Sequence, residues 1–465
     1  MGQEIFNHFK LMTTQSHSKK LYIKSYGCQM NTYDAKRMED ILRPLGYQST
    51  ELPDDADMVI LNTCHIREKA TDKVFSDLGR MREHKVNREQ NGKEMIIAVA
   101  GCVAQAEGDV ILQRAKYVDM VFGPQTYHLL PEMVTKINSS YGYARVINTD
   151  FPVEEKFDHL PQDNAVSGPT AHLSIQEGCD KFCTFCVVPY TRGSEYSRKV
   201  LGIMDEARRL IDQGVKDITL LGQNVNAYHG EAPDGSIWSL ARLIEELDKL
   251  EGLARIRYTT SHPCDVLDDL VAAHRDVPKL MPYLHLPVQS GSDKILKAMN
   301  RKHTVQSYLE TIAKFRAARP DIALSSDFIV GFPGETDEDF EATLSLVRQL
   351  PFGSAFTFKY SARPGTPAAN MQGLVPEKVK DERLQRLQAL ITASAETYNQ
   401  SFVGKTLEVL FDGRQAKEGQ LHGRTAYNQA VHADAHERLY GTVAEVEITR
   451  AGHMALHGHV KTANN

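Results

Sequence analysis

Three cysteines stand close together in the sequence EGCDKFCTFCVVPYTRG: Cys179, Cys183 and Cys186. Their spacing, C-x-x-x-C-x-x-C, places three thiolates in one loop, where they can bind three irons of a cubic four-iron four-sulfur cluster. With no fourth cysteine nearby, one iron keeps an open coordination position for a substrate or cofactor. A structural zinc site is the competing interpretation, and it needs a further ligand such as His172 or His229. The spacing favours the iron–sulfur cluster.

A second set of three cysteines is spread over the first hundred or so residues. Cys28 ends YIKSYGC, Cys64 ends MVILNTC and Cys102 ends IIAVAGC, so each thiol follows an apolar stretch. If these stretches are parallel strands, their loops emerge at one edge of the sheet and the thiols converge. One buried thiol is usually inert packing, but three in the same register predict a second three-cysteine cluster. Cys264, in SHPCD, belongs to neither set.

The elements that must position these cysteines follow an α/β pattern, and the first of them make a parallel α/β domain at residues 19–147. Strands are predicted at residues 21–26, 57–61, 95–100 and 118–122, with an amphipathic helix at 33–45. Residues 1–18 are predicted to be a mobile extension. Residues 148–169, rich in Pro, Asp and Asn, are predicted to be a linker between domains.

A second alternating series predicts a partial (β/α)6 barrel within a domain at residues 170–395. Its six strands are predicted at residues 172–176, 217–222, 255–260, 283–287, 323–331 and 355–360. Helices are predicted between them at 201–213, 239–250, 305–318 and 337–350. Six units in about 200 residues fit an incomplete barrel better than a complete one, which takes ~250. An open side leaves room for a large substrate.

The last domain, residues 396–465, has a different pattern and follows a long charged helix at 376–400. Short runs at 407–411, 421–432 and 442–449, separated by turn residues, predict a small antiparallel β-barrel. The histidine-rich end, GHMALHGH, is interpreted as a partly disordered tail.

Composition limits the possible functions. The chain has 465 residues, of which 42% are hydrophobic and 25% charged, with seven cysteines, which excludes a disulfide scaffold and a disordered chain. No apolar run reaches the ~20 residues of a membrane helix, and the first twenty residues lack the apolar core of a signal peptide, so a cytosolic protein without membrane contact is expected. The net charge of −6 gives no electrostatic argument for a nucleic-acid partner. Nothing requires more than a monomer.

The loop at Cys179 resembles the signature of radical S-adenosylmethionine (SAM) enzymes, with Phe185 in the aromatic position before the last cysteine. The resemblance implies that the amino and carboxylate groups of SAM bind the open iron, and that one electron then cleaves SAM to methionine and a 5′-deoxyadenosyl radical. Six further SAM contacts are implied at strand ends: Gly222, Gln223, Asn224, Gln289, Ser290 and Gly331. A polar turn is the alternative role for the first three, and helix capping by Ser290 or Ser292 for the next two. A tight turn is the alternative for Gly331.

The whole chain from about residue 19 to 460 is similar to the methylthiotransferase family. The motifs that carry this resemblance are YGCQMN, NTCHIREKA, AGCVAQ, GQNVNAY, YLHLPVQSGSDKILKAMNR, DFIVGFPGET and GRTAYNQAV, which favour the branch of the family that acts on transfer RNA. The resemblance implies two 4Fe-4S clusters, two SAM molecules per turnover, and methylthiolation of carbon 2 of N-6-isopentenyladenosine beside the anticodon. It also implies an electron donor and a sulfur or cluster donor as partners. Methylthiolation of threonylcarbamoyladenosine, or of an aspartate in a ribosomal protein, remains an alternative, and a two-cluster electron carrier is disfavoured.

The C-terminal module resembles a TRAM domain, a small β-barrel associated with RNA binding. Its predicted RNA contacts are Arg424, Tyr427 and Asn428 in GRTAYNQ, since Arg pairs with phosphate and Tyr stacks on bases. Residues 397–465 hold seven Lys or Arg and seven Asp or Glu, so charge adds no support. Further RNA candidates, each with an ordinary solvated surface as the alternative, are Tyr190, Arg192, Arg301 and His303.

Overall fold

The computed structural model describes residues 18–64, 70–139, 145–151, 157, 166, 168–414 and 419–461, without the side chains of residues 70–72. All but one residue of the expected N-terminal extension, and most of the expected linker at 148–169, lie outside the described residues. The chain forms two compact units, Met1–Ala165 and Val166–Asn465.

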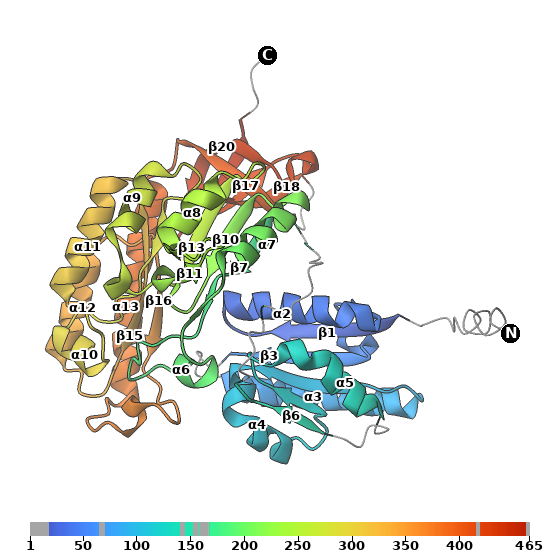
Figure 1. Ribbon diagram of the computed structural model, residues 1–465. Coiled ribbons are helices and arrows are strands. Elements are labelled where there is room, and N and C mark those ends of the chain that lie inside the picture. Colours follow the sequence, from blue (N-terminus) through green and yellow to red (C-terminus); the bar gives the residue numbers. More distant parts are fainter. Residues whose placement is uncertain are drawn as a thin grey trace. The chain divides into compact units, whose positions relative to one another are not determined.

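The first unit is a six-stranded parallel sheet with helices on both faces (Figure 1). The strand order is β2-β1-β3-β4-β5-β6. The strands are β1 (Lys19–Ser25), β2 (Tyr47–Ser49), β3 (Met58–Thr63), β4 (Ile96–Gly101), β5 (Met120–Phe122) and β6 (Val146–Asn148). The helices are α2 (Gln29–Leu42), α3 (Ala70–Gln90), α4 (Cys102–Arg114) and α5 (Leu130–Ser139). The four predicted strands are present, and β2 and β6 were missed because three residues are too few to show a period.

The central strands of this sheet are apolar and buried along their whole length, as parallel strands covered on both faces must be. Alternate residues serve opposite faces. Ile60 and Ala98 pack in the cluster that contains α2 and α5, whereas Val59 and Val99 pack in the cluster that contains α3 and α4. The sheet therefore provides a rigid base for the loops at its carboxyl edge.

The second unit begins with a partial parallel barrel, as predicted. Its six strands are β7 (Thr170–Ser174), β10 (Asp217–Leu221), β13 (Arg255–Thr259), β14 (Tyr283–His285), β15 (Ala323–Val330) and β16 (Ser354–Lys359). They form two three-stranded parallel sheets that meet where Ile256 bridges to Leu280. The covering helices are α7 (Val200–Asp212), α8 (Leu240–Asp248), α9 (Asp268–Asp276), α10 (Asp293–Ala298), α11 (Val305–Ala318), α12 (Asp337–Gln349) and α13 (Glu377–Gln400). Prediction missed α9, α10, the short helix α6 (Val188–Thr191) and the small pairs β8 (Gln176–Glu177) with β9 (Tyr196–Ser197) and β11 (His229–Glu231) with β12 (Ile237–Ser239).

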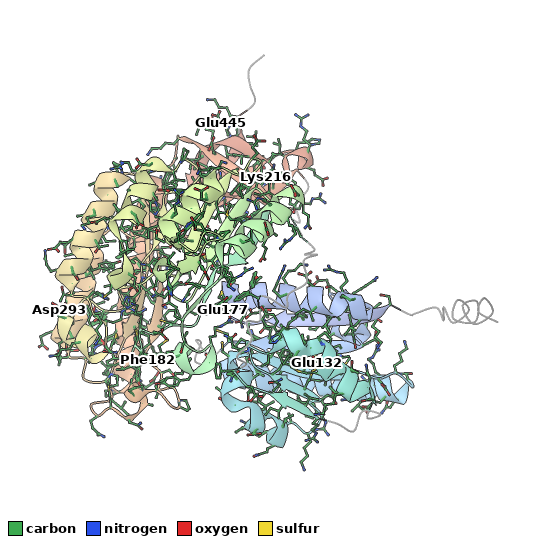
Figure 2. The ribbon with its side chains drawn as sticks, in the orientation of Figure 1. Glu132, Glu177, Phe182, Lys216, Asp293 and Glu445 are labelled. Atoms are coloured by element: carbon green, nitrogen blue, oxygen red, sulfur yellow. The ribbon has the colours of Figure 1, made fainter. Side chains whose placement is uncertain are left out.

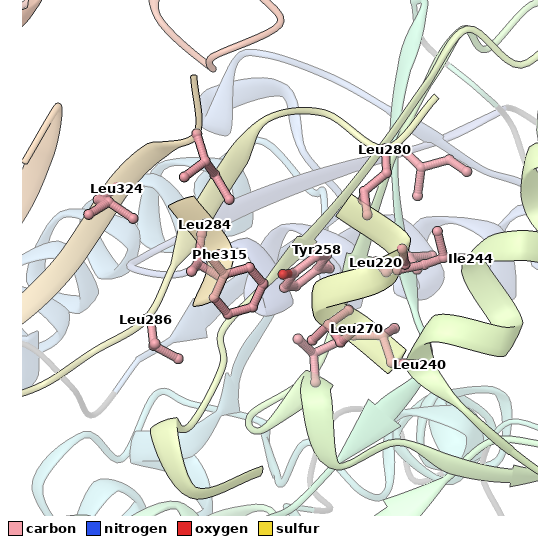
Figure 3. Close-up of a cluster of buried hydrophobic side chains, with 14 of the residues drawn as sticks. Leu220, Leu240, Ile244, Tyr258, Leu270, Leu280, Leu284, Leu286, Phe315 and Leu324 are labelled. Carbon is pink, nitrogen blue, oxygen red and sulfur yellow. The ribbon is translucent and has the colours of Figure 1, made fainter. Parts of the chain in front are cut away.

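Apolar residues on alternate strand positions pack outward against the helices (Figure 3). Leu220, Tyr258, Leu284 and Leu324 belong to this buried cluster, and Phe315 of α11 packs with them. The side chains of the strand residues between them point the other way, into the barrel, because side chains alternate along a strand. Those positions include Thr219, Arg257, His285 and Ser325, so the inside of the barrel is polar.

The C-terminal module is a closed five-stranded barrel, β17-β18-β19-β21-β20. Its strands are β17 (Thr406–Arg414), β18 (Gln420–Thr425), β19 (Ala430–Asp434), β20 (Val443–Ala451) and β21 (Ala455–Val460). Three predictions need correction here. The run 421–432 is a hairpin of two strands, the histidine-rich tail forms β21, and the β19–β21 pair is parallel in an otherwise antiparallel barrel.

This module binds to the amino-terminal end of the large barrel through two buried arginines. Arg257 donates to the carbonyl oxygens of Thr425 and Ala426 at 2.8 and 2.9 Å and pairs with Asp217 at 3.0 Å. Arg255 donates to the carbonyl oxygen of Arg424 at 2.7 Å. Asp217 and Arg255 are the first residues of their strands, so the opposite, carboxyl ends remain available for a site.

Candidate functional site

The loop that carries Cys179, Cys183 and Cys186 leaves β7 at the carboxyl end of the barrel, and its start is fixed by a glycine and a glutamine. The backbone N–H of Gly178 donates to Oε1 of Gln223 at 2.7 Å. Gly178 has φ +70°, and a Cβ at this position would lie 1.9 Å from the carbonyl oxygen of Ser194, so only glycine fits. The next residue, Cys179, donates its N–H to the carbonyl oxygen of Gly193 at 3.3 Å.

The middle of the loop is held by the end of α10. Asn300 donates from Nδ2 to the carbonyl oxygen of Phe182 at 2.9 Å, and Thr184 donates its N–H to the carbonyl oxygen of Met299 at 3.0 Å. Phe182, labelled in Figure 2, has φ +46° and is about half exposed. A left-handed conformation at phenylalanine is uncommon, and such backbone strain clusters at functional sites.

The three thiols lie within electrostatic range of one another in a poorly solvated setting. Burial raises the pKa of Cys186 to about 12, with Cys183 adding to the effect, and burial raises the pKa of Cys179 to about 11. Arg301 donates from Nη1 to Sγ of Cys183 at 3.7 Å. In the described part of the chain, no three Cys, His, Asp or Glu side chains are already gathered in metal-ligand geometry. The donor set still fits an iron cluster, because thiolates form when a cation replaces their protons.

The second cysteine set lies where the sequence predicted, at the carboxyl ends of three adjacent strands. Cys28 caps the start of α2 after β1, Cys64 follows β3 directly, and Cys102 opens α4 after β4. The order β1-β3-β4 makes these strands neighbours, and Thr63 pairs with Gly101 one position before the two cysteines. Gly27 has φ +98°, and a Cβ there would lie 2.6 Å from Sγ of Cys64. The loop that ends in Cys28 therefore passes directly over Cys64.

A buried polar network ties these three strand ends together. Asn31 of α2 donates from Nδ2 to the carbonyl oxygens of Tyr26 and Thr63 at 2.9 and 2.8 Å. Asn62 donates back to the carbonyl oxygen of Asn31 at 2.7 Å. Thr63 donates to the carbonyl oxygen of Ala100 at 2.6 Å and accepts from the N–H of Val103. Fully buried polar groups with these partners fix the geometry of an edge that carries three thiols.

The predicted SAM contacts are dispersed over four strand ends, and several of them have structural roles. Asn224 is buried and donates to Asp265 at 2.8 Å, while its Oδ1 has no hydrogen-bond partner within the described chain. Gln289 has φ +78° and bridges to Phe328. Ser292, and not Ser290, caps α10.

The remaining predicted contacts border the same region. Gly222 is packed against Gln176, since a Cβ would lie 2.6 Å from its Oε1. Gly331 has φ +72° and lies against Lys380. Phe185 packs against the small apolar cluster that contains Ile295 and Phe332. None of these positions excludes contact with SAM, so they remain predictions.

Three of the four proposed RNA contacts near the loop are buried, so they are wrong as surface sites. Arg192 is 3% exposed and pairs with Glu177 at 3.2 Å. Arg301 is also buried, and it donates hydrogen bonds to Sγ of Cys183 and to the carbonyl oxygen of Pro287. His303 is buried as well. Only Tyr190, about half exposed, keeps the accessibility that stacking needs.

Sequence reasoning missed a buried histidine pair next to the loop. The rings of His262 and His303 lie 6.0 Å apart, edge to face. Burial lowers the pKa of His262 to about 2 and that of His303 to about 4, with Arg301 contributing to both, so both are neutral at physiological pH. Neither Nε2 has a hydrogen-bond partner among the described residues. The sequence analysis named His303 only as an RNA candidate and did not connect it with His262, because SHP and RKH look like ordinary polar turns.

In the C-terminal barrel, the predicted RNA contacts lie at the β18–β19 turn. Tyr427 donates its hydroxyl to Oδ2 of Asp321 at 3.0 Å, across the junction with the large barrel. Asn428 has φ +67° and accepts from Arg424 at 3.1 Å through its carbonyl oxygen. Arg424 is exposed on β18. Tyr427 and Asn428 thus have roles in the turn and in docking, besides any contact with RNA.

The same barrel brings three histidines into a row that prediction did not anticipate. His422 of β18 lies opposite His432 of β19, which lies opposite His457 of β21. The ring centroids are 5.3 Å apart at both steps, and the second pair is stacked. Oδ1 of Asp412 on β17 lies 3.0 Å from Nδ1 of His422, within hydrogen-bond distance. If the run 421–432 had been predicted as a hairpin with its turn centred on Tyr427, the pairing of His422 with His432 would have followed from the register of the two strands.

Comparison with protein families divides the chain in the same way. Residues 173–347 match the radical SAM superfamily. The chain contains a radical SAM domain. Residues 20–123 match the uncharacterised protein family UPF0004, and residues 400–461 match the TRAM domain. This order of three domains is typical of methylthiotransferases that modify transfer RNA or protein, and the TRAM domain indicates RNA binding.

Solved structures share the fold at low identity. The radical S-adenosylmethionine methyltransferase TsrM from Kitasatospora setae, solved with cobalamin and a [4Fe-4S] cluster, has a TM-score of 0.55 and 14% identity, over 76% of this chain and 77% of that chain. The cobalamin-dependent S-adenosylmethionine radical enzyme OxsB has a TM-score of 0.51 and 13% identity, over 83% of this chain and 57% of that chain.

Among the helices that the structure describes, none is long and apolar enough to span a membrane.

Proposed function

We propose that the protein is a transfer-RNA methylthiotransferase, tRNA-2-methylthio-N-6-dimethylallyladenosine synthase. It would replace the hydrogen on carbon 2 of N-6-isopentenyladenosine, beside the anticodon, with a methylthio group. The observation that carries the proposal is the presence of two cysteine triads in one chain, one in the radical SAM loop and one at three adjacent strand ends. A radical enzyme that only abstracts hydrogen has no need of the second triad.

The chemistry explains why both triads are needed. Carbon 2 of adenine bears an unactivated hydrogen that acid–base catalysis does not replace. When bound, two 4Fe-4S clusters and two SAM molecules would supply an electron, a carbon-centred radical, a sulfur atom and the methyl group that this sulfur carries. Cys179, Cys183 and Cys186 would hold one cluster, and Cys28, Cys64 and Cys102 the other.

The chain's own residues hold these ligands in place. Gln223 and Asn300 fix the two halves of the radical SAM loop through its backbone. Arg301 donates to the sulfur of Cys183, and a donor to a ligating sulfur stabilises its thiolate. In the first unit, Asn31 and Thr63 join the three strand ends that carry the other thiols.

Mass spectrometry of transfer-RNA nucleosides from a deletion strain tests the proposal. We expect 2-methylthio-N-6-isopentenyladenosine to disappear, N-6-isopentenyladenosine to accumulate, and the intact gene to reverse both changes. Persistence of that nucleoside together with loss of methylthiolated threonylcarbamoyladenosine would assign the sister activity. Loss of a methylthio-aspartate from a ribosomal protein, with normal transfer RNA, would assign the protein-modifying activity.

We further propose that the row of His422, His432 and His457 is part of the surface through which the TRAM domain contacts RNA. Imidazole rings stack on unpaired bases, and Arg424 and Arg450 on the same barrel can pair with phosphate. Burial lowers the pKa of His432 and of His457, and the neighbouring His422 and Arg450 add to this effect. The lowered pKa values favour the neutral imidazole at His432 and His457, which suits stacking more than charge pairing.

Replacing all three histidines of the row with glutamine is expected to weaken transfer-RNA binding about 10- to 100-fold, because each lost base stack is worth ~1–3 kcal/mol and these stacks are not additive. Filter binding or fluorescence anisotropy at fixed salt measures the effect. His453→Gln is the matched control, since His453 is an exposed histidine in the same barrel outside the row. Equal affinity of the triple variant and the control would remove the row from the RNA surface.

A further inference from the structure

One carboxyl group, that of Asp327, lies on the inner face of the large barrel. Asp327 lies in the middle of β15, between Ser326 and Phe328, and its side chain is 24% exposed. Phe328 and Val330 on the same strand pack outward in the core, so Asp327 has the opposite direction, into the polar interior. In the described part of the chain, no group donates a hydrogen bond to its carboxylate within normal distance.

The neighbours of Asp327 come from each adjoining element. His285 on β14 places Nε2 3.5 Å from Oδ1 of Asp327, and Nδ1 of His285 lies 3.1 Å from the hydroxyl of Ser325. On the other side, β16 presents Phe356, which is directly opposite Asp327 in the sheet. Arg301, which contacts Cys183, is the charged group that acts on Asp327 from the loop after α10. The carboxyl group therefore belongs to the same interior as the cysteine loop.

Burial raises the pKa of Asp327 to about 7, with Arg301 opposing the shift. Burial also lowers the pKa of His285 to about 4, so this imidazole is neutral at physiological pH. At and below neutrality, a large fraction of Asp327 is thus a carboxylic acid, with one O–H donor beside one carbonyl acceptor.

That pair of groups matches one edge of adenine. The N6–H donor of an N6-alkylated adenine lies next to the N7 acceptor, and side-chain amides bind adenine through this same pair. Carbon 2 is on the opposite side of the base, so contact at N6 and N7 leaves it open to reaction. We propose that Asp327, supported by His285, binds the target adenine through N6–H and N7 in the barrel interior. This inference rests on the proposed function and names the residue that holds its substrate.

Substitution of Asp327 by asparagine and by leucine separates hydrogen bonding to adenine from a purely structural role of this side chain. Asp327→Asn keeps one donor and one acceptor, so it is expected to bind an isopentenylated anticodon stem-loop within about threefold of the wild type. Asp327→Leu keeps similar volume but offers neither, and it is expected to bind about 10- to 100-fold more weakly and to raise KM by a similar factor. Asp212→Asn, at an exposed position in α7, is the matched control.

The pH dependence gives a second readout. Wild-type affinity for the stem-loop is expected to fall as pH rises through about 7, because the acid loses the proton that N7 accepts, whereas Asp327→Asn is expected to bind equally from pH 6 to 8.5. If Asp327→Leu bound the stem-loop with wild-type affinity, or if the Asn and Leu variants lost affinity equally, this inference would be overturned and the proposed function would stand. A wild-type enzyme that neither binds the isopentenylated stem-loop nor modifies it would overturn the proposed function together with the inference.

Discussion

Replacing Cys179, Cys183 and Cys186 together with alanine is expected to abolish reductive cleavage of SAM. Without these thiolates, no cluster with an open iron can form in the loop, and neither methionine nor 5′-deoxyadenosine is produced. The loop itself is expected to persist, because its backbone is held by Gln223, Asn300 and Gly193 and not by the thiols. Chromatography of 5′-deoxyadenosine after chemical reduction measures the loss.

The chain supplies its own control for this experiment. Cys264 is exposed and belongs to neither triad, so Cys264→Ala is expected to retain cleavage and iron content. The triple variant should also lose about four of eight irons per chain and unfold at nearly the same temperature as the wild type. Deoxyadenosine at the wild-type level from the triple variant would refute the assignment of this loop.

Much of the fold could be predicted because parallel strands have a clear signature. Strands such as β3, β4 and β15 are buried on one or both faces, so they appear as apolar runs separated by helical periods. Elements of three residues, such as β2 and β6, leave no such period and were missed. The positions of the six cysteines were predictable for a related reason, because three of them each follow a strand end and the other three share the loop after β7.

The roles of single polar residues were much harder to predict. The short run MNRKH reads as a solvated basic surface, yet Arg301 and His303 are buried, and Arg301 donates to Cys183. Tyr427 was predicted as a base-stacking residue, but its hydroxyl joins the small barrel to Asp321. A polar residue on the surface and a polar residue in a buried contact look the same in the sequence. Only the neighbours that the tertiary fold supplies decide which of the two it is.

Asp327 and the histidine row could not be predicted for a further reason: each depends on register between strands. Asp327 gains its role from His285, 42 positions earlier in the chain, across the β14–β15 pair. His432 gains its neighbours from β18 and β21, and the latter was taken for a disordered tail. A pattern within one strand shows which face a residue lies on, but not what lies opposite.

Replacing Cys28, Cys64 and Cys102 together with alanine is expected to separate the two activities of the chain. Cleavage of SAM should continue, because the radical SAM loop belongs to another unit with its own supports. Methylthiolation of transfer RNA should stop, because no thiolate remains at the strand ends to hold a cluster that supplies sulfur. Parallel assays of 5′-deoxyadenosine and of 2-methylthio-N-6-isopentenyladenosine measure the two outcomes on one preparation.

The iron content decides whether these thiols hold a cluster at all. The variant is expected to bind about four irons per chain where the wild type binds about eight. Alanine is a small change at Cys64 and Cys102, which are buried beside the network of Asn31, Asn62 and Thr63, so the sheet should stay intact. Eight irons in the variant would mean that the convergence of three strand ends serves packing. Four irons with undiminished methylthiolation would mean that the sulfur comes from elsewhere, and the two-triad argument for the proposed function would fail.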